Sequence, residues 1–168
     1  MLDKIRAILE LKDCFKEICQ DENDKLSITV DNQLHPDNYL IVDVTNYYTS
    51  LKLANQPRTP DCFIIQRCTN GNYRLIIIEF KKARHGSSIK KEEIQEKLNT
   101  CFDDFILRKF KSYLNISYAN IDLYLISNRA SEKRDSGLSL KILAGVKINF
   151  NGRKLMVQPQ SELTLLLC

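Results

Sequence analysis

Two strand-like apolar runs on either side of an Asn-Gly pair constrain the fold of this sequence more than any other feature. The first run, CFIIQRC, covers residues 62–68, and the second, YRLIIIEF, covers residues 73–80. Both are rich in β-branched and aromatic residues, and Asn-Gly between two such runs is a strong signal for a β-hairpin. We therefore expect antiparallel pairing. Because Leu-Ile-Ile-Ile is uninterrupted, the second strand should be covered on both faces.

The segments around this hairpin predict an α/β fold. Apolar residues at helical spacing predict amphipathic helices over roughly the first twenty residues and over 89–114. Three further segments have strand-like composition: 25–30, 38–48 and 121–127. A second Asn-Gly pair, at residues 151–152, predicts another hairpin. We expect a single domain over residues 1–168, with a central mixed β-sheet flanked by helices.

Composition excludes some classes of protein and leaves others open. The formal net charge of +4 is too small to indicate a nucleic-acid-binding protein by itself. No apolar run is long enough to span a membrane, and the first residues mix charges into the apolar pattern, unlike a secretory signal. The six cysteines form no CxxC pair, and no histidines stand at zinc spacing, so we expect free buried thiols. These features predict an intracellular, cytoplasmic protein without a membrane partner.

Charged residues stand where the two hairpin strands begin and end. Pro60-Asp61 opens the first strand, and Glu79-Phe80-Lys81 ends the second, with Glu79 and Lys81 on one face. Mg²⁺ commonly binds through one or two carboxylates plus substrate phosphate oxygens. A bound cation would activate water, and a lysine would stabilise developing charge. The pattern predicts phosphodiester hydrolysis; the alternative is a surface ion pair beside an ordinary turn.

The pairing register decides whether the two carboxylates meet. A strict two-residue turn at Asn70-Gly71 sets Asp61 opposite Phe80, and opposite residues share a face, so Asp61 would point away from Glu79. We therefore predict an odd-length or bulged connection within residues 69–72, or an Asp61 that lies just before regular pairing begins.

The Pro60-Asp61 pair, the hairpin, the Glu79-Phe80-Lys81 triplet and the helix that follows resemble the PD-(D/E)xK nuclease superfamily, which has the restriction-endonuclease-like fold. The resemblance covers roughly residues 39–126. It implies that Asp61 and Glu79 bind Mg²⁺, with Mn²⁺ as a substitute, and that Lys81 assists the attacking water. It further implies a DNA endonuclease of restriction or homing type. An RNA endonuclease of the same fold, or a catalytically inactive module for nucleic-acid binding or assembly, remains an alternative.

Members of this superfamily often use a further acidic residue, and this chain offers three candidates. Glu10 and Glu17 lie on one side of the first predicted helix, where a solvated acidic face is the alternative. Asp43 lies among strand hydrophobes, where it is either a ligand or a hydrogen-bonded structural residue. Gln95 is followed four positions later by Asn99 instead of the tyrosine of some exonuclease branches, which disfavours that branch.

Basic residues after the predicted site suggest where nucleic acid would lie. The candidates for phosphate contacts are Lys82, Arg84, Lys90, Lys91, Arg129, Lys133 and Arg134. Solvated charged segments are the alternative for all of them. Tyr47 and Tyr48 either stack on bases or pack in a strand, one on each face. Cleavage of both strands of a duplex by one small domain usually requires a symmetric dimer, so we expect a homo-oligomer.

Overall fold

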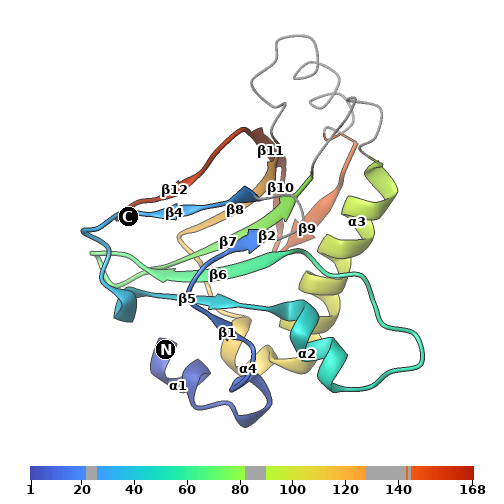
Figure 1. Ribbon diagram of the computed structural model, residues 1–168, viewed down its shortest axis with the longest axis horizontal. Coiled ribbons are helices and arrows are strands. Elements are labelled where there is room, and N and C mark those ends of the chain that lie inside the picture. Colours follow the sequence, from blue (N-terminus) through green and yellow to red (C-terminus); the bar gives the residue numbers. More distant parts are fainter. Residues whose placement is uncertain (22–25, 82–89, 128–142, 144) are drawn as a thin grey trace.

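A six-stranded mixed β-sheet forms the centre of the protein (Figure 1). The computed structural model describes residues 1–168 apart from 22–25, 82–89, 128–142 and 144. In spatial order the strands are β1 (Phe15–Lys16), β5 (Tyr39–Val42), β6 (Cys62–Arg67), β7 (Tyr73–Phe80), β8 (Asn120–Ile126) and β11 (Val157–Gln160). Strands β1, β5, β6 and β7 pair antiparallel, whereas β8 is parallel to β7 and β11 is parallel to β8. The predicted α/β class with a central mixed sheet is confirmed.

Short strand pairs and helices surround this sheet. The pairs are β2 (Gln20–Asp21) with β3 (Leu26–Ser27), β4 (Thr29–Val30) with β12 (Thr164–Leu165), and β9 (Ile148–Phe150) with β10 (Arg153–Leu155). The helical segments are α1 (Leu2–Arg6), η1 (Leu9–Leu11), η2 (Pro36–Asn38), α2 (Val44–Ser50), α3 (Lys91–Asn99), η4 (Thr100–Lys109) and α4 (Lys111–Leu114). The β9–β10 hairpin and the helical run from α3 to α4 confirm two predictions. Within the described ranges, no helix has the length and apolar character that crossing a membrane requires.

The sheet separates two hydrophobic clusters, because alternate side chains of a strand point to opposite faces. On one face, Leu75 and Ile77 of β7 belong to the same cluster as Phe105 of η4. On the other face, Ile76 belongs to a cluster that includes Leu165 of β12. All of these side chains are buried. Strand β7 is therefore covered on both faces, as its apolar run predicts.

The β6–β7 hairpin has the odd-length connection that the charged residues require. The backbone N–H of Cys68 donates to the carbonyl of Asn72 at 2.8 Å, so residues 69–71 form a three-residue loop. Continuing the register of the paired strands by one residue sets Asp61 opposite Glu79. Opposite residues share a face of the sheet. The hairpin thus brings the two carboxylates to the same side, which confirms the predicted register.

The N-terminal region differs most from the sequence prediction. A helix over the first twenty residues is wrong, because α1 ends at Arg6, only the short turn η1 follows, and the chain then enters β1. In β1, Phe15 pairs with Val42 and completes one edge of the sheet. Ile18, a member of the predicted apolar stripe, is 53 % exposed. Hydrogen bonding of residues 15–16 to β5 outweighs the local helical preference of this segment.

The predicted strand over 38–48 is only partly correct, because a helix replaces its second half. The side chain of Asp43 accepts a hydrogen bond from the backbone N–H of Asn46 at 2.9 Å and caps the start of α2. Tyr47 and Tyr48 therefore lie in α2, where both are buried against Phe105. Their packing role is confirmed, although in a helix, and base stacking is wrong since neither ring reaches the surface.

The prediction of free thiols is wrong for four cysteines, which form two disulfides: Cys19–Cys62 and Cys68–Cys168. Cys14 and Cys101 are buried and free. The paired cysteines lie 43 and 100 residues apart in the sequence, so their spacing shows no local pattern. Disulfides persist mainly in oxidising compartments. They therefore favour such a location over the predicted cytoplasm.

Candidate active site

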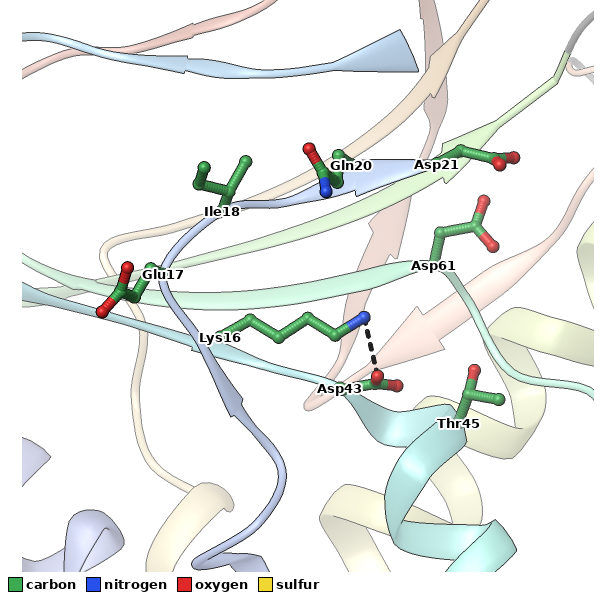
Figure 2. Close-up of a pocket in the computed structure, with 8 residues that line it drawn as sticks. All are labelled: Lys16, Glu17, Ile18, Gln20, Asp21, Asp43, Thr45 and Asp61. Atoms are coloured by element: carbon green, nitrogen blue, oxygen red, sulfur yellow. Dashed lines mark ion pairs between the residues drawn. The ribbon is translucent and has the colours of Figure 1, made fainter. Parts of the chain in front are cut away.

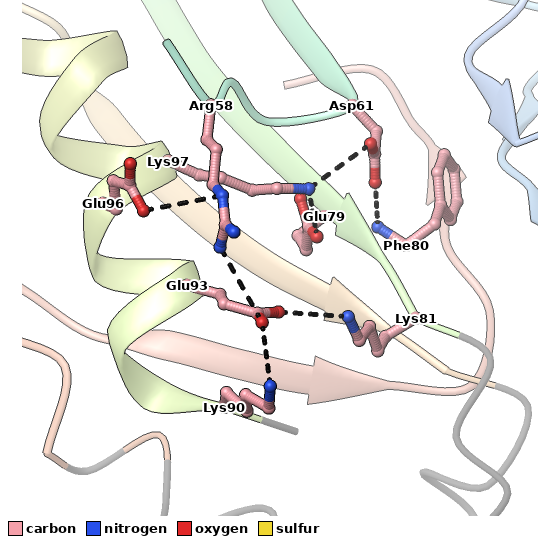
Figure 3. Close-up of polar contacts among 9 residues, drawn as sticks. All are labelled: Arg58, Asp61, Glu79, Phe80, Lys81, Lys90, Glu93, Glu96 and Lys97. Atoms are coloured by element: carbon pink, nitrogen blue, oxygen red, sulfur yellow. Dashed lines mark hydrogen bonds and ion pairs between the residues drawn. The ribbon is translucent and has the colours of Figure 1, made fainter. Parts of the chain in front are cut away.

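Asp61 and Glu79 come together where β6 begins and β7 ends (Figure 3). Glu79 is 6 % exposed and lies on the sheet face that α3 and η4 cover. Asp61 directly precedes β6, and its Oδ2 accepts a hydrogen bond from the backbone N–H of Phe80 at 2.6 Å. This bond orients the Asp61 carboxylate towards the end of β7. The hairpin thus places a paired set of acids at the edge of the buried core.

Lys97 of α3 is the cation that contacts both acids, and sequence reasoning missed it. Its Nζ lies 2.6 Å from Glu79 Oε1 and 3.8 Å from Asp61 Oδ1. Ile94 and Leu98, which flank it on α3, are both buried and direct this part of the helix onto the sheet. Residues three positions apart share a helix face. In the sequence, the three-residue spacing between Ile94 and Lys97 therefore indicated that the Lys97 side chain points to the sheet.

Burial dominates the electrostatics of the two acids. Burial raises the pKa of Glu79 to about 8, and the negative charge of Asp61 adds to this rise. The pKa of Asp61 is also raised, chiefly by burial. Burial alone would lower the pKa of Lys97, but the charges of Glu79 and Asp61 outweigh it and raise that pKa. At neutral pH Glu79 therefore holds a proton for most of the time, and the Lys97 ammonium faces the charge of the half-buried Asp61. A cation that binds Glu79 has to displace this proton.

The lysine predicted from the motif, Lys81, forms its ion pair with Glu93 instead of the two acids, although its charge still acts on Glu79. Its Nζ lies 3.5 Å from Glu93 Oε2 on α3, although it follows Glu79 by two residues on the same side. Lys90 also contacts Glu93, at 3.4 Å, and Lys91 is the first residue of α3. Five predicted phosphate contacts lie outside the described residues: Lys82, Arg84, Arg129, Lys133 and Arg134.

A pocket of about 700 Å³ borders Asp61 (Figure 2). Its lining consists of Lys16, Glu17, Ile18, Gln20, Asp21, Asp43, Thr45 and Asp61. Of the additional acids predicted, Glu17 and Asp43 line this pocket, whereas Glu10 lies in η1 and is exposed. Asp43 Oδ2 forms an ion pair with Lys16 Nζ at 2.7 Å. Its Oδ1 accepts the hydrogen bond that caps α2. Asp43 is therefore engaged structurally at both oxygens.

The acidic pair fits a hard cation such as Mg²⁺. In the described part of the chain, Glu79 Oε2 is buried and has no hydrogen-bond partner. Mg²⁺ takes oxygen ligands and usually keeps several waters, with one or two carboxylates and substrate phosphates completing its shell. Among the residues the structure describes, no group of three His, Cys, Asp or Glu side chains forms a complete protein metal cage. Asp61 and Glu79 thus supply carboxylate oxygens from two residues, of which Asp61 also lines the pocket of Figure 2.

Comparison of this chain with protein-family models, curated proteins and solved structures finds no match. The chemistry of this site therefore has to be argued from its own residues.

Proposed function

We propose that this protein is a Mg²⁺-dependent endonuclease that hydrolyses phosphodiester bonds in DNA, of restriction or homing type. The observation that carries the proposal is the acidic pair at the strand ends: Asp61 and Glu79 share one side of the hairpin, and Glu79 keeps a buried oxygen without a hydrogen-bond partner in the described ranges. A buried acceptor left unsatisfied is costly unless a proton, a ligand or an ion uses it. Without metal, the raised pKa of Glu79 allows a proton to take this place, in a side-chain hydrogen bond with Asp61. A divalent cation would satisfy it and offset the repulsion between the two acids.

Each residue of the site has a defined task in this proposal. Asp61 and Glu79 would hold Mg²⁺, which supplies Lewis-acid polarisation of the phosphoryl oxygen and lowers the pKa of a bound water. Lys97 contacts both carboxylates and keeps them oriented. Its ammonium would also donate a hydrogen bond to the phosphoryl oxygen on which negative charge develops. The backbone N–H of Phe80 holds Asp61 in place. Water attacks phosphorus and gives up a proton to the solvent, the P–O bond to the leaving oxygen breaks, and that oxygen takes up a proton from the solvent, which yields a phosphate monoester and a free hydroxyl.

Cleavage of both strands requires two such sites. A domain of 168 residues reaches only one strand with a single site, so we propose that a homodimer acts on duplex DNA. The two disulfides favour an encounter with nucleic acid outside a reducing cytoplasm.

A module without catalysis, used for nucleic-acid binding or assembly, is the second candidate. The contact of 2.6 Å between Lys97 and Glu79 favours it, since an ammonium already lies where a metal ion would compensate the acids. The two candidates differ in metal dependence. An enzyme binds Mn²⁺ or Mg²⁺ through the acidic pair, whereas a structural ion pair shows no metal effect.

Nuclease assays with matched variants test the proposal. Purified protein is incubated with supercoiled plasmid, linear duplex or single-stranded RNA, in Mg²⁺, Mn²⁺ or EDTA. We expect metal-dependent DNA cleavage by the wild type and by Glu92→Gln, an exposed carboxylate on α3. Asp61→Asn, Glu79→Gln and Lys97→Met should abolish cleavage. Cleavage of RNA alone would change the substrate class. If no substrate is cut and titration detects no Mn²⁺ binding, the second candidate replaces the enzyme.

A further inference from the structure

Three basic side chains from three separate segments converge on one carboxylate, that of Glu93 (Figure 3). Arg58 precedes β6, Lys81 follows β7, and Lys90 immediately precedes α3. Their nitrogen atoms lie 3.7, 3.5 and 3.4 Å from the Glu93 oxygens, respectively. The cluster is therefore assembled by the tertiary fold and not by one charged stretch of sequence.

The cluster carries more positive than negative charge. Arg58 also lies 3.7 Å from Glu96, so three cations face two carboxylates. Each of these distances exceeds the length of a strong charge-assisted hydrogen bond. The side chains of Arg58 and Lys90 are more than half exposed, and exposed ion pairs contribute little to stability. A different anion can thus replace the Glu93 carboxylate at small cost.

The position of the cluster relates it to the acidic pair. Lys81 follows Glu79 by two residues, and Glu93 lies one helical turn before Lys97 on α3. Glu93 and Lys81 therefore flank the acids on the same side as Lys97, as Figure 3 shows. A nucleic-acid strand that places one phosphate at the acids presents its neighbouring phosphates along this surface. Arginine and lysine are the usual phosphate contacts in such interfaces.

We infer that Arg58, Lys81 and Lys90 bind a backbone phosphate adjacent to the one that is cleaved, and that Glu93 occupies this anion site in the free protein. The inference rests on the proposed function, because that function identifies the anion as part of a nucleic acid. When substrate binds, its phosphate replaces the Glu93 carboxylate in the contacts with the three basic side chains. Glu93 therefore competes with the phosphate and weakens the binding of nucleic acid.

Equilibrium binding without metal tests the inference separately from catalysis. A fluorescein-labelled duplex of about 20 base pairs, long enough for several phosphate contacts, is titrated in EDTA and monitored by anisotropy over a series of KCl concentrations. Glu93→Gln is compared with Glu92→Gln, which removes the same charge from the same helical turn. Arg58→Gln is compared with Arg67→Gln, at the opposite end of β6. Circular dichroism and thermal unfolding verify that all four variants fold.

We expect Glu93→Gln to bind the duplex about fivefold more tightly than Glu92→Gln, the factor for one ion–ion contact at about 4 Å in water. Arg58→Gln should bind about fivefold more weakly than Arg67→Gln, and its salt dependence should fall by about 0.9 in slope. Equal affinities within either pair, or no binding by any variant at low salt, would overturn the inference. If this pattern holds but no cleavage occurs, the phosphate site stands and only the catalytic proposal fails. If cleavage occurs without this pattern, only the phosphate site fails.

Discussion

Replacement of Glu79 by glutamine should change how the stability of the protein depends on pH. Burial, with the charge of Asp61, raises the pKa of Glu79 from its ordinary value of 4.5 to about 8 in the folded state. The folded protein therefore retains a proton over a pH range in which the unfolded chain has released it. Stability contributed by this group is lost as pH rises from 4.5 towards 8, because folding must then take up a proton.

The size of the effect follows from the pKa difference. One pKa unit corresponds to about 1.36 kcal/mol. Between pH 4.5 and pH 7, Glu79 should lower the free energy of unfolding by about 3 kcal/mol, and Glu79→Gln should remove this pH-dependent loss. The hydrogen bond with Glu79 lowers the pKa of Asp61, so glutamine, which can still donate a hydrogen bond to Asp61, is the replacement that changes this second titration least.

Urea unfolding monitored by circular dichroism between pH 5 and pH 8, in EDTA and with the disulfides intact, measures this difference. We expect the variant to gain stability over the wild type as pH rises, and the exposed Glu92→Gln to follow the wild type. A difference between wild type and Glu79→Gln that stays constant across the pH range would refute the buried-acid reasoning. So would a difference that shrinks as pH rises.

Three further predictions concern other parts of the fold. Lys97→Met leaves the buried Glu79 and the half-buried Asp61 without their ammonium. It should lower the free energy of unfolding at pH 8 by about 3 kcal/mol, with partial recovery in Mg²⁺; urea unfolding that matches the wild type would contradict it. The double variant Cys19→Ser, Cys62→Ser opens a 43-residue loop and should cost about 4 kcal/mol, measured by denaturant unfolding against reduced and oxidised wild type. Gly71→Ala, at a φ of 81°, should cost about 1 kcal/mol by thermal unfolding, and an unchanged melting temperature would count against strain at this turn.

The hairpin and its charges could be predicted because their signals are local. Asn-Gly between two apolar runs specifies a reversal within a few residues, and the strand period of two then determines which side chains share a face. Asp61 and Glu79 followed from that reasoning once the connection was taken as odd in length. The same reasoning could not find Lys97, because its contact with the acids depends on how α3 packs on the sheet.

The predictions that failed depended on contacts between distant segments. Helical spacing in the first twenty residues was real, but pairing of β1 with β5 uses the same backbone groups that a longer helix would need. Free thiols were inferred from spacing, whereas the fold brings Cys19 to Cys62 across 43 residues. A sequence pattern reports the local preference of a segment. The strand β1 and the disulfide instead depend on a backbone or sulfur atom that is distant in the sequence and that the fold brings close.

By itself, the sequence determined the α/β class and the two Asn-Gly hairpins, and it placed one acid at the start and one at the end of the paired strands; the three-residue loop that brings the acids to one side was seen only in the structure. These features arise from side-chain periodicity and turn chemistry, which act over a few residues. Only the tertiary structure decided which cation faces the acids, where Lys81 points and which cysteines pair. The physical reason is that burial and ion pairing depend on distances between atoms, and the packing of helix α3 on the sheet sets those distances at this site.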